Sequence, residues 1–350
     1  MPRRVDNPPV RYAERRLEYE EGERPDAWLE IHEERVQSAL SRNDSPDLGF
    51  RWSLNPYRGC YHGCIYCYAR PSHAYWGWGA GTDFERKIVV KVNIAEELER
   101  ELQSRRWKRE TVAISGNTDP YQPLEGRYRL TRRCLEVFLR ARTPVSVVTK
   151  GALVAQDADL LAELARHVGA RVTISIAFDD DETARRLEPW ASPPSRRFDA
   201  LRVLSEAGVP TSVAVAPIVP GINEASIPSI LERARDAGAR AAWMTLLRLP
   251  GEVGDVFEAR LSELWPERVS RVRRALYEMR GGRVTESRFG HRMRGVGERW
   301  AMVERLFELT CRRLGLRTGP VGDADPASVG AVSHQGRSGD GQLALFDDEV

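Results

Sequence analysis

Cysteine is scarce in this chain, which has five cysteines among 350 residues. So few cysteines exclude a small scaffold held by disulfides, and they fit a reducing compartment. Long apolar runs are missing too, because no stretch approaches the roughly 18 consecutive apolar residues of a membrane-spanning helix. The chain starts with charged and polar residues in place of an apolar signal region. We therefore expect a cytoplasmic protein with no membrane partner.

Lysine is the other rare residue, since only four of the 53 basic residues are lysines. A net charge of +2 indicates no particular class of partner, so a lysine matters chiefly for where it stands. The hydrophobic fraction of 41% permits a sizeable core. The length suits one large α/β domain or two ordinary ones.

Three of the cysteines, Cys60, Cys64 and Cys67, stand together in the segment 55–67. Structural zinc sites and iron–sulfur clusters usually take four protein ligands. No second Cys/His pair follows that would complete a zinc site, so three thiolates would leave one iron of a cluster open to a substrate or cofactor. A zinc ribbon without its second half and a disulfide are the weaker alternatives.

Short apolar segments alternate with amphipathic ones along the chain. The pattern predicts strands at 50–54, 111–115, 145–149, 172–176, 211–215 and 242–246. It predicts helices at 94–106, 132–142 and 157–167, the last capped by Asp157, and two more that end at Gly208 and Gly238. Six strand–helix units predict an α/β fold with a parallel sheet, which we interpret as an incomplete (β/α)6 TIM-like barrel. A doubly wound sheet is the alternative.

Polar residues follow several of these strands. Gly116, Asn117, Thr118 and Asp119 come after the second strand, Lys150 ends the third, and Ser175 lies in the fourth. Because the functional residues of such barrels lie at the carboxyl ends of the strands, we expect all of them on one rim with the cysteine loop. A turn without a ligand at 116–119 and a surface role for Lys150 are the alternatives.

The spacing Cys-x3-Cys-x2-Cys, with Tyr66 directly before the last cysteine, resembles the signature of the radical S-adenosylmethionine (SAM) enzymes. This resemblance implies that the three cysteines hold a 4Fe–4S cluster whose open iron binds SAM, and that Tyr66 lies near the adenine. It also implies that the backbone of 116–118 meets the SAM amino group. Lys150 would bind the SAM carboxylate, and Ser175 the ribose or carboxylate. The usual Gly-Gly-Glu of the family is replaced here.

Five motifs between residue 43 and about residue 315 resemble the branch related to spore photoproduct lyase, often labelled DNA repair photolyase-like. They are Asn43-Asp44-Ser45-Pro46, 55–60, 66–71, 118–125 and Thr149-Lys150. The resemblance implies an enzyme that cleaves SAM reductively to a 5′-deoxyadenosyl radical, with an external electron donor and a nucleic-acid substrate. Radical chemistry on a peptide or small metabolite, and a metal-stabilised DNA- or clamp-binding module without catalysis, are the alternatives.

One feature of that branch is missing. Its hydrogen-donating cysteine near the end of the second strand has no counterpart here, and we expect Cys134 and Cys311 to be ordinary buried thiols. Tyr68 and Tyr121 are therefore candidate hydrogen donors. Asp119 and Glu125 are candidate carboxylates of the rim.

We divide the chain into a charged leader (1–45), a radical SAM core barrel (46–250), a helical and basic C-terminal extension (251–317) and a disordered tail (318–350). The extension contains Ser287–Gly295, a basic loop with glycines that could contact phosphates; an arginine-rich solvated surface is the alternative.

The tail ends in the motif Gln342-Leu343-Ala344-Leu345-Phe346. This pentapeptide is similar to the motif by which bacterial DNA-processing proteins bind the replication sliding clamp. We therefore expect the clamp as a candidate partner, reached through a flexible linker.

Overall fold

The computed structural model describes residues 28–319 and contains two sheets. The larger sheet has the order β11-β10-β9-β8-β7-β6-β3-β2. Its strands from β3 to β11 pair in parallel, and β2 is antiparallel to β3. The strands are β2 (Leu40–Arg42), β3 (Trp52–Leu54), β6 (Val112–Ile114), β7 (Val145–Thr149), β8 (Ala170–Ser175), β9 (Thr211–Ile218), β10 (Ala241–Leu246) and β11 (Arg317–Thr318).

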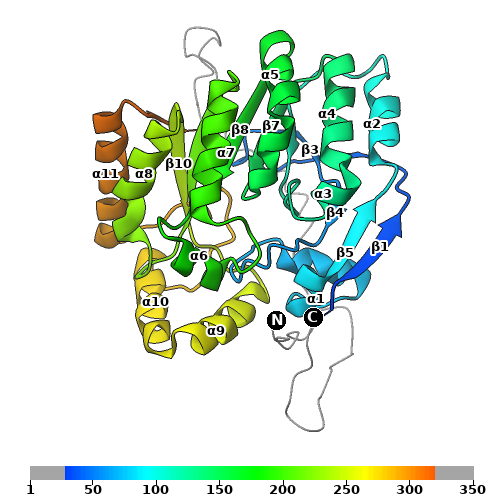
Figure 1. Cartoon of the computed structure of the whole chain (residues 1–350). Coiled ribbons are helices and arrows are strands. Elements are labelled where there is room, and N and C mark those ends of the chain that lie inside the picture. The colour runs from blue at the N-terminus through cyan, green and yellow to red at the C-terminus, as the bar shows by residue number, and fades with distance from the viewer. Residues whose placement is uncertain (1–27, 320–350) are drawn as a thin grey trace, which may run out of the picture.

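Helices follow the strands and pack beside one another on one side of the sheet, as Figure 1 shows for α2, α4, α5, α7 and α8. The α-helices are α1 (Thr82–Arg86), α2 (Ile94–Leu102), α3 (Glu125–Tyr128), α4 (Leu130–Arg140), α5 (Ala158–His167), α6 (Asp181–Leu187), α7 (Pro194–Glu206), α8 (Ile227–Asp236), α9 (Val253–Leu264), α10 (Pro266–Met279) and α11 (Gly297–Leu314). The 3-10 helices are η1 (Arg70–Trp76), η2 (Ala152–Asp157) and η3 (Glu224–Ser226).

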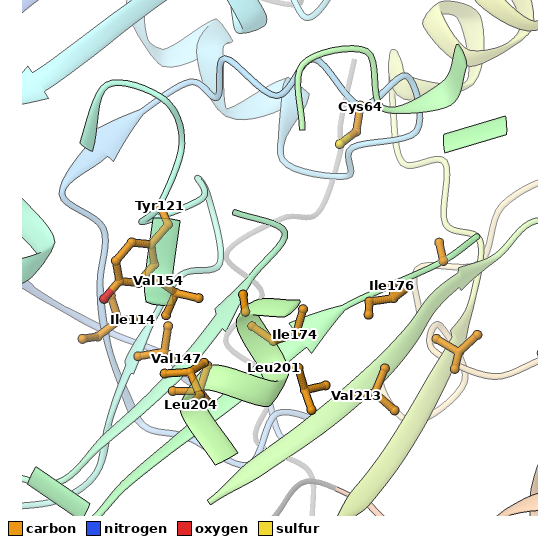
Figure 2. Packing of buried hydrophobic residues seen from close by; sticks show 14 of the residues in the cluster. Cys64, Ile114, Tyr121, Val147, Val154, Ile174, Ile176, Leu201, Leu204 and Val213 are labelled. Carbon is orange, nitrogen blue, oxygen red and sulfur yellow. The ribbon is translucent and has the colours of Figure 1, made fainter. Parts of the chain in front are cut away.

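The core is formed by the apolar residues that recur at helical spacing in the helices and by the apolar residues of the strands. In α2 the apolar residues recur every four positions, and Ile94, Leu98 and Leu102 are buried along one face. Figure 2 shows the other half of the core, where residues of successive strands such as Ile114 and Val147 pack together. The helices cover one face of the sheet, and the other face lies inside the barrel. Strands such as β6 are therefore buried on both faces, which accounts for their nearly continuous apolar residues.

The predicted α/β class and six-unit incomplete barrel are confirmed. The strand at 145–149 has the predicted bounds. Each of the other five differs from its predicted bounds by one to three residues at one end or at both. The helical C-terminal extension is present as α9, α10 and α11. Within residues 28–319, no helix is long and apolar enough to span a membrane. Gln342–Phe346 lies outside the described residues.

Part of the segment expected to be a leader belongs to the sheets. Its residues Glu30–Glu34 form β1, which pairs in parallel with β5 (Lys87–Lys91). β5 also pairs with β4 (Tyr57–Arg58), which makes the smaller sheet β1-β5-β4. Residues 40–42, which form β2, belong to the larger sheet because they pair with β3. The boundary at residue 45 stays a prediction, and residues 1–27 lie outside the description.

The N-cap residue of α5, Asp157, is at the predicted position, but the predicted capping hydrogen bond is not formed. The carboxylate instead accepts hydrogen bonds from Arg132 (2.8 Å) and the Tyr121 hydroxyl (3.0 Å). A charge-assisted bond to a guanidinium is stronger than a bond to a backbone N–H, so the tertiary partner takes the carboxylate.

Candidate functional site

The three clustered cysteines lie on a loop of successive turns. The N–H of Gly63 donates to the Cys60 carbonyl (3.3 Å), and the N–H of Cys67 donates to the Cys64 carbonyl (3.2 Å). Cys60 and Cys64 are buried and Cys67 is half-buried. Burial, then the charges of Asp119 and of the other two thiols, raise the pKa of Cys60 well above its usual range. The three thiols are thus near neighbours in one buried region.

Three neighbouring thiols are a donor set that suits an iron–sulfur cluster. Within residues 28–319, no three His, Cys, Asp or Glu side chains are grouped closely enough to hold one metal ion. A zinc ion needs its ligands within bonding distance of a single point, whereas the ligands of a 4Fe–4S cluster bind different irons and stand further apart. Three thiols on one loop can therefore hold three irons of such a cluster and leave the fourth iron open.

A fully buried arginine anchors the cysteine loop. The Arg70 guanidinium donates to the carbonyls of Gly63 (3.2 Å) and Cys64 (2.8 Å) and to Glu85 (2.7 Å). Arg260 of α9 approaches the other oxygen of Glu85 at 3.0 Å. These bonds satisfy the carbonyls of the loop from the protein side, so the backbone around the cysteines is held in one conformation.

The loop after β6 is joined directly to the cysteine loop. The Thr118 hydroxyl donates to the Gly59 carbonyl (2.5 Å), and the N–H of Asn117 donates to the Asn55 side chain (3.0 Å). Gly116 has a φ of 123°, which a side chain would oppose. The structure therefore places 116–118 beside the cysteines, as the barrel rule predicts.

Asp119 connects the ends of β6 and β7. Its carboxylate accepts from the Thr149 hydroxyl (2.5 Å) and from the N–H of Lys150 (2.7 Å), and His62 Nδ1 lies 3.5 Å away. Burial alone would raise the pKa of Asp119, but His62 and the hydrogen bonds outweigh burial and lower it. The carboxylate is thus ionised and occupied within the protein, which suits a positioning role.

Two predicted cofactor-binding residues, Lys150 and Tyr66, meet at a carboxylate that the sequence analysis did not identify, Glu188, and a third, Ser175, joins them through Lys150. Lys150 Nζ lies 3.0 Å from Glu188 and 2.8 Å from the Ser175 hydroxyl, while the Tyr66 hydroxyl donates to Glu188. Arg197 of α7 also binds this carboxylate. Burial raises the pKa of Glu188, but Arg197 and then Lys150 overcome this and lower it to about 2.

This network contains two cations and one carboxylate. Lys150 and Arg197 together carry two positive charges against the single negative charge of Glu188. Lys150 is the partly exposed member, with 15% of its side chain accessible. Its excess positive charge lies next to Cys64, because the charges of Glu188 and Lys150 both act on the pKa of that thiol.

The two candidate tyrosines differ in their positions. Tyr121 is buried, and Figure 2 shows its ring directed away from Cys64, toward Asp157 in the core. Tyr68 directly follows Cys67 and is 50% exposed. Of the two, Tyr68 is the one that a substrate can reach.

The remaining candidates are core residues. Glu125 is buried and accepts a hydrogen bond from the Tyr57 hydroxyl, so it does not face the rim. Cys134 and Cys311 are both fully buried, as expected for ordinary thiols.

Comparison with known proteins agrees with these features. The model of the radical SAM superfamily matches residues 54–234, more than half of the chain. An uncharacterized protein of Mycobacterium tuberculosis is 38% identical over 248 residues, which cover 70% of this chain and 73% of that protein. The radical SAM Nalpha-GlyT isomerase of Pseudomonas phage M6 is 29% identical over 169 residues, which cover 48% of this chain and 33% of the isomerase.

Solved structures of spore photoproduct lyase share the fold. The lyase complexed with dinucleoside spore photoproduct has a TM-score of 0.59 and 19% identity, with 82% of this chain and 80% of the lyase covered. A mutant lyase with bound AdoMet and dinucleoside spore photoproduct has a TM-score of 0.57. The cysteine loop, the incomplete barrel and the extent of the matched region lead to one assignment: the chain is an enzyme of the radical SAM superfamily, whose members use a 4Fe–4S cluster and SAM.

Proposed function

We propose that Cys60, Cys64 and Cys67 hold the 4Fe–4S cluster of this enzyme and that its substrate is a nucleic acid. The observation that supports the first part is the meeting of three neighbouring thiols, two buried and one half-buried, with the ends of β6, β7 and β8 on one rim. Held by these three cysteines and supplied with one electron by an external donor, the cluster would provide the reductive cleavage of SAM to methionine and a 5′-deoxyadenosyl radical, which would take a hydrogen atom from the substrate.

The neighbouring residues are suited to orient SAM. The network of Lys150, Arg197 and Glu188 has one excess positive charge beside Cys64, which favours a carboxylate. Ser175 shares its hydroxyl with Lys150 and offers a further polar group to a ribose or carboxylate. Tyr66 presents its ring next to Lys150, with 5.7 Å between Nζ and the ring centroid, and we assign it to the adenine. The backbone of 116–118 is assigned to the SAM amino group.

Two observations favour a nucleic acid over a peptide or small metabolite. The solved structures that share this fold include a lyase with a bound dinucleoside. The rim near Tyr68 is bordered by the basic segment Ser287–Gly295, whose Arg292 influences the pKa of Tyr68. Tyr68 is the residue that we assign as hydrogen donor to a product radical, since it is accessible and adjacent to the cluster loop.

The cluster and SAM assignment is tested with anaerobically reconstituted protein. We expect dithionite reduction to give a paramagnetic cluster whose spectrum changes on addition of SAM, with formation of 5′-deoxyadenosine. Cys64→Ala should lose both signals. Cys311→Ala, which removes a buried thiol in α11 far from the loop in sequence, should retain them. A protein that binds one zinc ion and ignores SAM would support the non-catalytic binding module instead.

The substrate class has a separate test. Binding of DNA or RNA oligonucleotides that weakens steeply with salt supports a nucleic acid, because release of counterions from phosphates drives such binding. Binding of none at low salt would favour a peptide or small metabolite. The sliding clamp as a partner of Gln342–Phe346 stays a prediction from the sequence.

A further inference from the structure

Three guanidinium groups gather beside Tyr68. Arg248 follows β10, Arg280 follows α10, and Arg292 belongs to the basic loop. They are close enough to act on one another, since Arg292 lowers the pKa of Arg248 and Arg248 lowers that of Arg280, in each case after burial. Asp47 binds Arg292 within this group, and Glu286, which is paired with Arg288, also acts on the pKa of Arg280.

Two of the three guanidiniums have strong hydrogen-bond partners within the protein. Arg292 binds both oxygens of Asp47, at 2.7 and 2.5 Å. Arg280 donates to the carbonyls of Leu247 (2.7 Å) and Arg294 (2.9 Å) and so fastens the basic loop to the end of β10. Both therefore serve the structure of the rim.

Arg248 is different. Its Nε is buried with no hydrogen-bond partner, as the Nε of Arg280 is, but its Nη groups bind no carbonyl oxygen or carboxylate among the described residues. The one side-chain hydrogen bond found for it there is a weak one, from Nη1 to Met293 Sδ at 3.7 Å. No carboxylate within residues 28–319 forms an ion pair with it. A guanidinium stays charged, and a charge withdrawn from water without a partner is costly. Such an arrangement persists most readily where a ligand supplies the missing anion.

The position of Arg248 identifies where that anion would lie. Its guanidinium is 5.7 Å from the ring centroid of Tyr68, the half-exposed residue after Cys67. The exposed arginines of the basic loop are already paired, Arg288 with Glu286 and Arg294 with Glu304. Among these described arginines, Arg248 is thus the one with neither a carboxylate nor a carbonyl oxygen as a hydrogen-bond partner, and it lies outside the loop that the sequence singles out.

We propose that Arg248 binds a phosphodiester group of the substrate and thereby holds the adjacent nucleoside against Tyr68. The inference rests on the nucleic-acid substrate proposed above. The two Nη groups of a guanidinium form a fork that matches two phosphate oxygens, and in Arg248 these groups, unlike Nε, are not among the buried unpartnered atoms. A carboxylate of SAM would offer the same fork, and the test must separate the two anions.

The test uses the reconstituted holoprotein with Arg248→Gln and, as a matched control, Arg140→Gln, which lies on α4 at an exposed pair with Glu99. Binding of a fluorescein-labelled single-stranded DNA oligonucleotide is measured by anisotropy over a series of NaCl concentrations. We expect Arg248→Gln to bind roughly tenfold more weakly and to reduce the slope of log K against log[NaCl] by about 1. The control should match the wild type in both.

Two further readouts keep this inference separate from the proposed function. The thermal unfolding of each protein is measured with added inorganic phosphate, and SAM binding is measured by calorimetry. We expect phosphate to stabilise the wild type and the control but not Arg248→Gln, with SAM affinity unchanged. If phosphate protects through Arg248 while no oligonucleotide binds, the anion site stands and the nucleic-acid substrate fails.

Other outcomes would overturn the assignment of Arg248. Wild-type oligonucleotide affinity and phosphate protection in Arg248→Gln would do so and leave the nucleic-acid substrate intact. A loss confined to SAM binding would show that the anion is the SAM carboxylate. Arg248→Lys guards against a folding defect, because it keeps the charge and should retain the salt slope while losing the affinity that the fork provides.

Discussion

At the scale of single residues, the site depends on buried charges that face away from the substrate side. Arg70 and Glu85 hold the cysteine loop, while Glu188 and Arg197 hold Lys150 and Tyr66. Buried ion pairs contribute little net stability after desolvation, but removal of one partner is strongly destabilising. Their benefit here is a fixed geometry for groups that must meet a cofactor.

The sequence predicted the residues that follow strands, and it missed their partners. Cys60 was found from the spacing of the cysteines, and Lys150 and Ser175 were found because parallel strands end on one rim. Glu188 and Arg248 were not found, because each stands in a loop with no local motif and acquires its meaning from residues distant in sequence. Arg70 lies in the stretch after the last cysteine, where the resemblance marked it without indicating a role.

Glu125 allows a prediction for stability against pH. Burial raises its pKa to about 7 although Tyr57 donates a hydrogen bond to it. Since the folded-state pKa lies above that of the unfolded chain, the stability it contributes is present below about pH 4.5 and is lost as the pH rises through about 7. The loss is on the order of 3 kcal/mol at most, at roughly 1.4 kcal/mol per pKa unit.

Glu125→Gln should therefore flatten the dependence of the free energy of unfolding on pH between pH 5 and 8, as measured by urea denaturation. The amide oxygen can still accept from the N–H of Thr131, which lies 2.8 Å from Glu125 Oε1. Glu96→Gln, at an exposed pair with Arg133, is the control and should keep the slope. An unchanged slope in Glu125→Gln would show that Glu125 does not titrate in this range.

At the scale of elements, the turn that begins the cysteine loop is determined by space as well as by backbone conformation. Gly59 has a φ of 71°, and a Cβ there would stand 2.8 Å from both His73 Cε1 and the Phe84 carbonyl oxygen. Gly77 has a nearly equal φ of 68° but has nothing within 4 Å of such a Cβ. A side chain would therefore meet the same backbone strain at both glycines, but a steric conflict at Gly59 alone.

Alanine at both positions therefore makes a matched pair. Gly77→Ala should cost about 1 kcal/mol in the free energy of unfolding, the usual cost of a left-handed backbone. Gly59→Ala should cost about 1–3 kcal/mol more, because packed atoms must move, and it should lower the iron content after reconstitution. Equal effects of the two substitutions on stability and iron content would contradict the role assigned to close packing at Gly59.

Pairing between elements is what local patterns predicted least well. β1 has a single apolar residue and nothing local that marks it as a strand, whereas β5 contains three consecutive buried β-branched residues, 88–90, which the prediction did not use. They become strands by pairing with each other and with β4. Conversely, β7 shows the alternation of buried and partly buried residues that a local pattern can reveal, and its bounds were predicted correctly.

At the scale of the whole molecule, the barrel is incomplete, and contacts other than strand pairing connect its two sides. The outer strands of the larger sheet are β2 and β11, which do not pair with each other. Asp47 lies in the loop between β2 and β3, near one edge. Arg292 lies in the loop after α10, which is attached near the other edge by the hydrogen bond from the N–H of Leu246 to the Met293 carbonyl (3.0 Å). The Asp47–Arg292 pair thus links the two sides of the sheet beside Arg248.

Breaking this link should loosen the basic loop without unfolding the barrel. Asp47→Asn leaves the Arg292 guanidinium, 14% exposed, without its carboxylate. We expect faster trypsin cleavage after the arginines of 288–294, and a coupling of about 0.5–3 kcal/mol in a double-mutant cycle with Arg292→Gln, measured from free energies of unfolding. Arg294→Gln, which breaks a more exposed pair in the same loop, should give a smaller effect on stability. Additive effects of the Asp47 and Arg292 substitutions would mean that the two sides are joined by packing alone, because a working ion pair makes the second substitution cost less than the first.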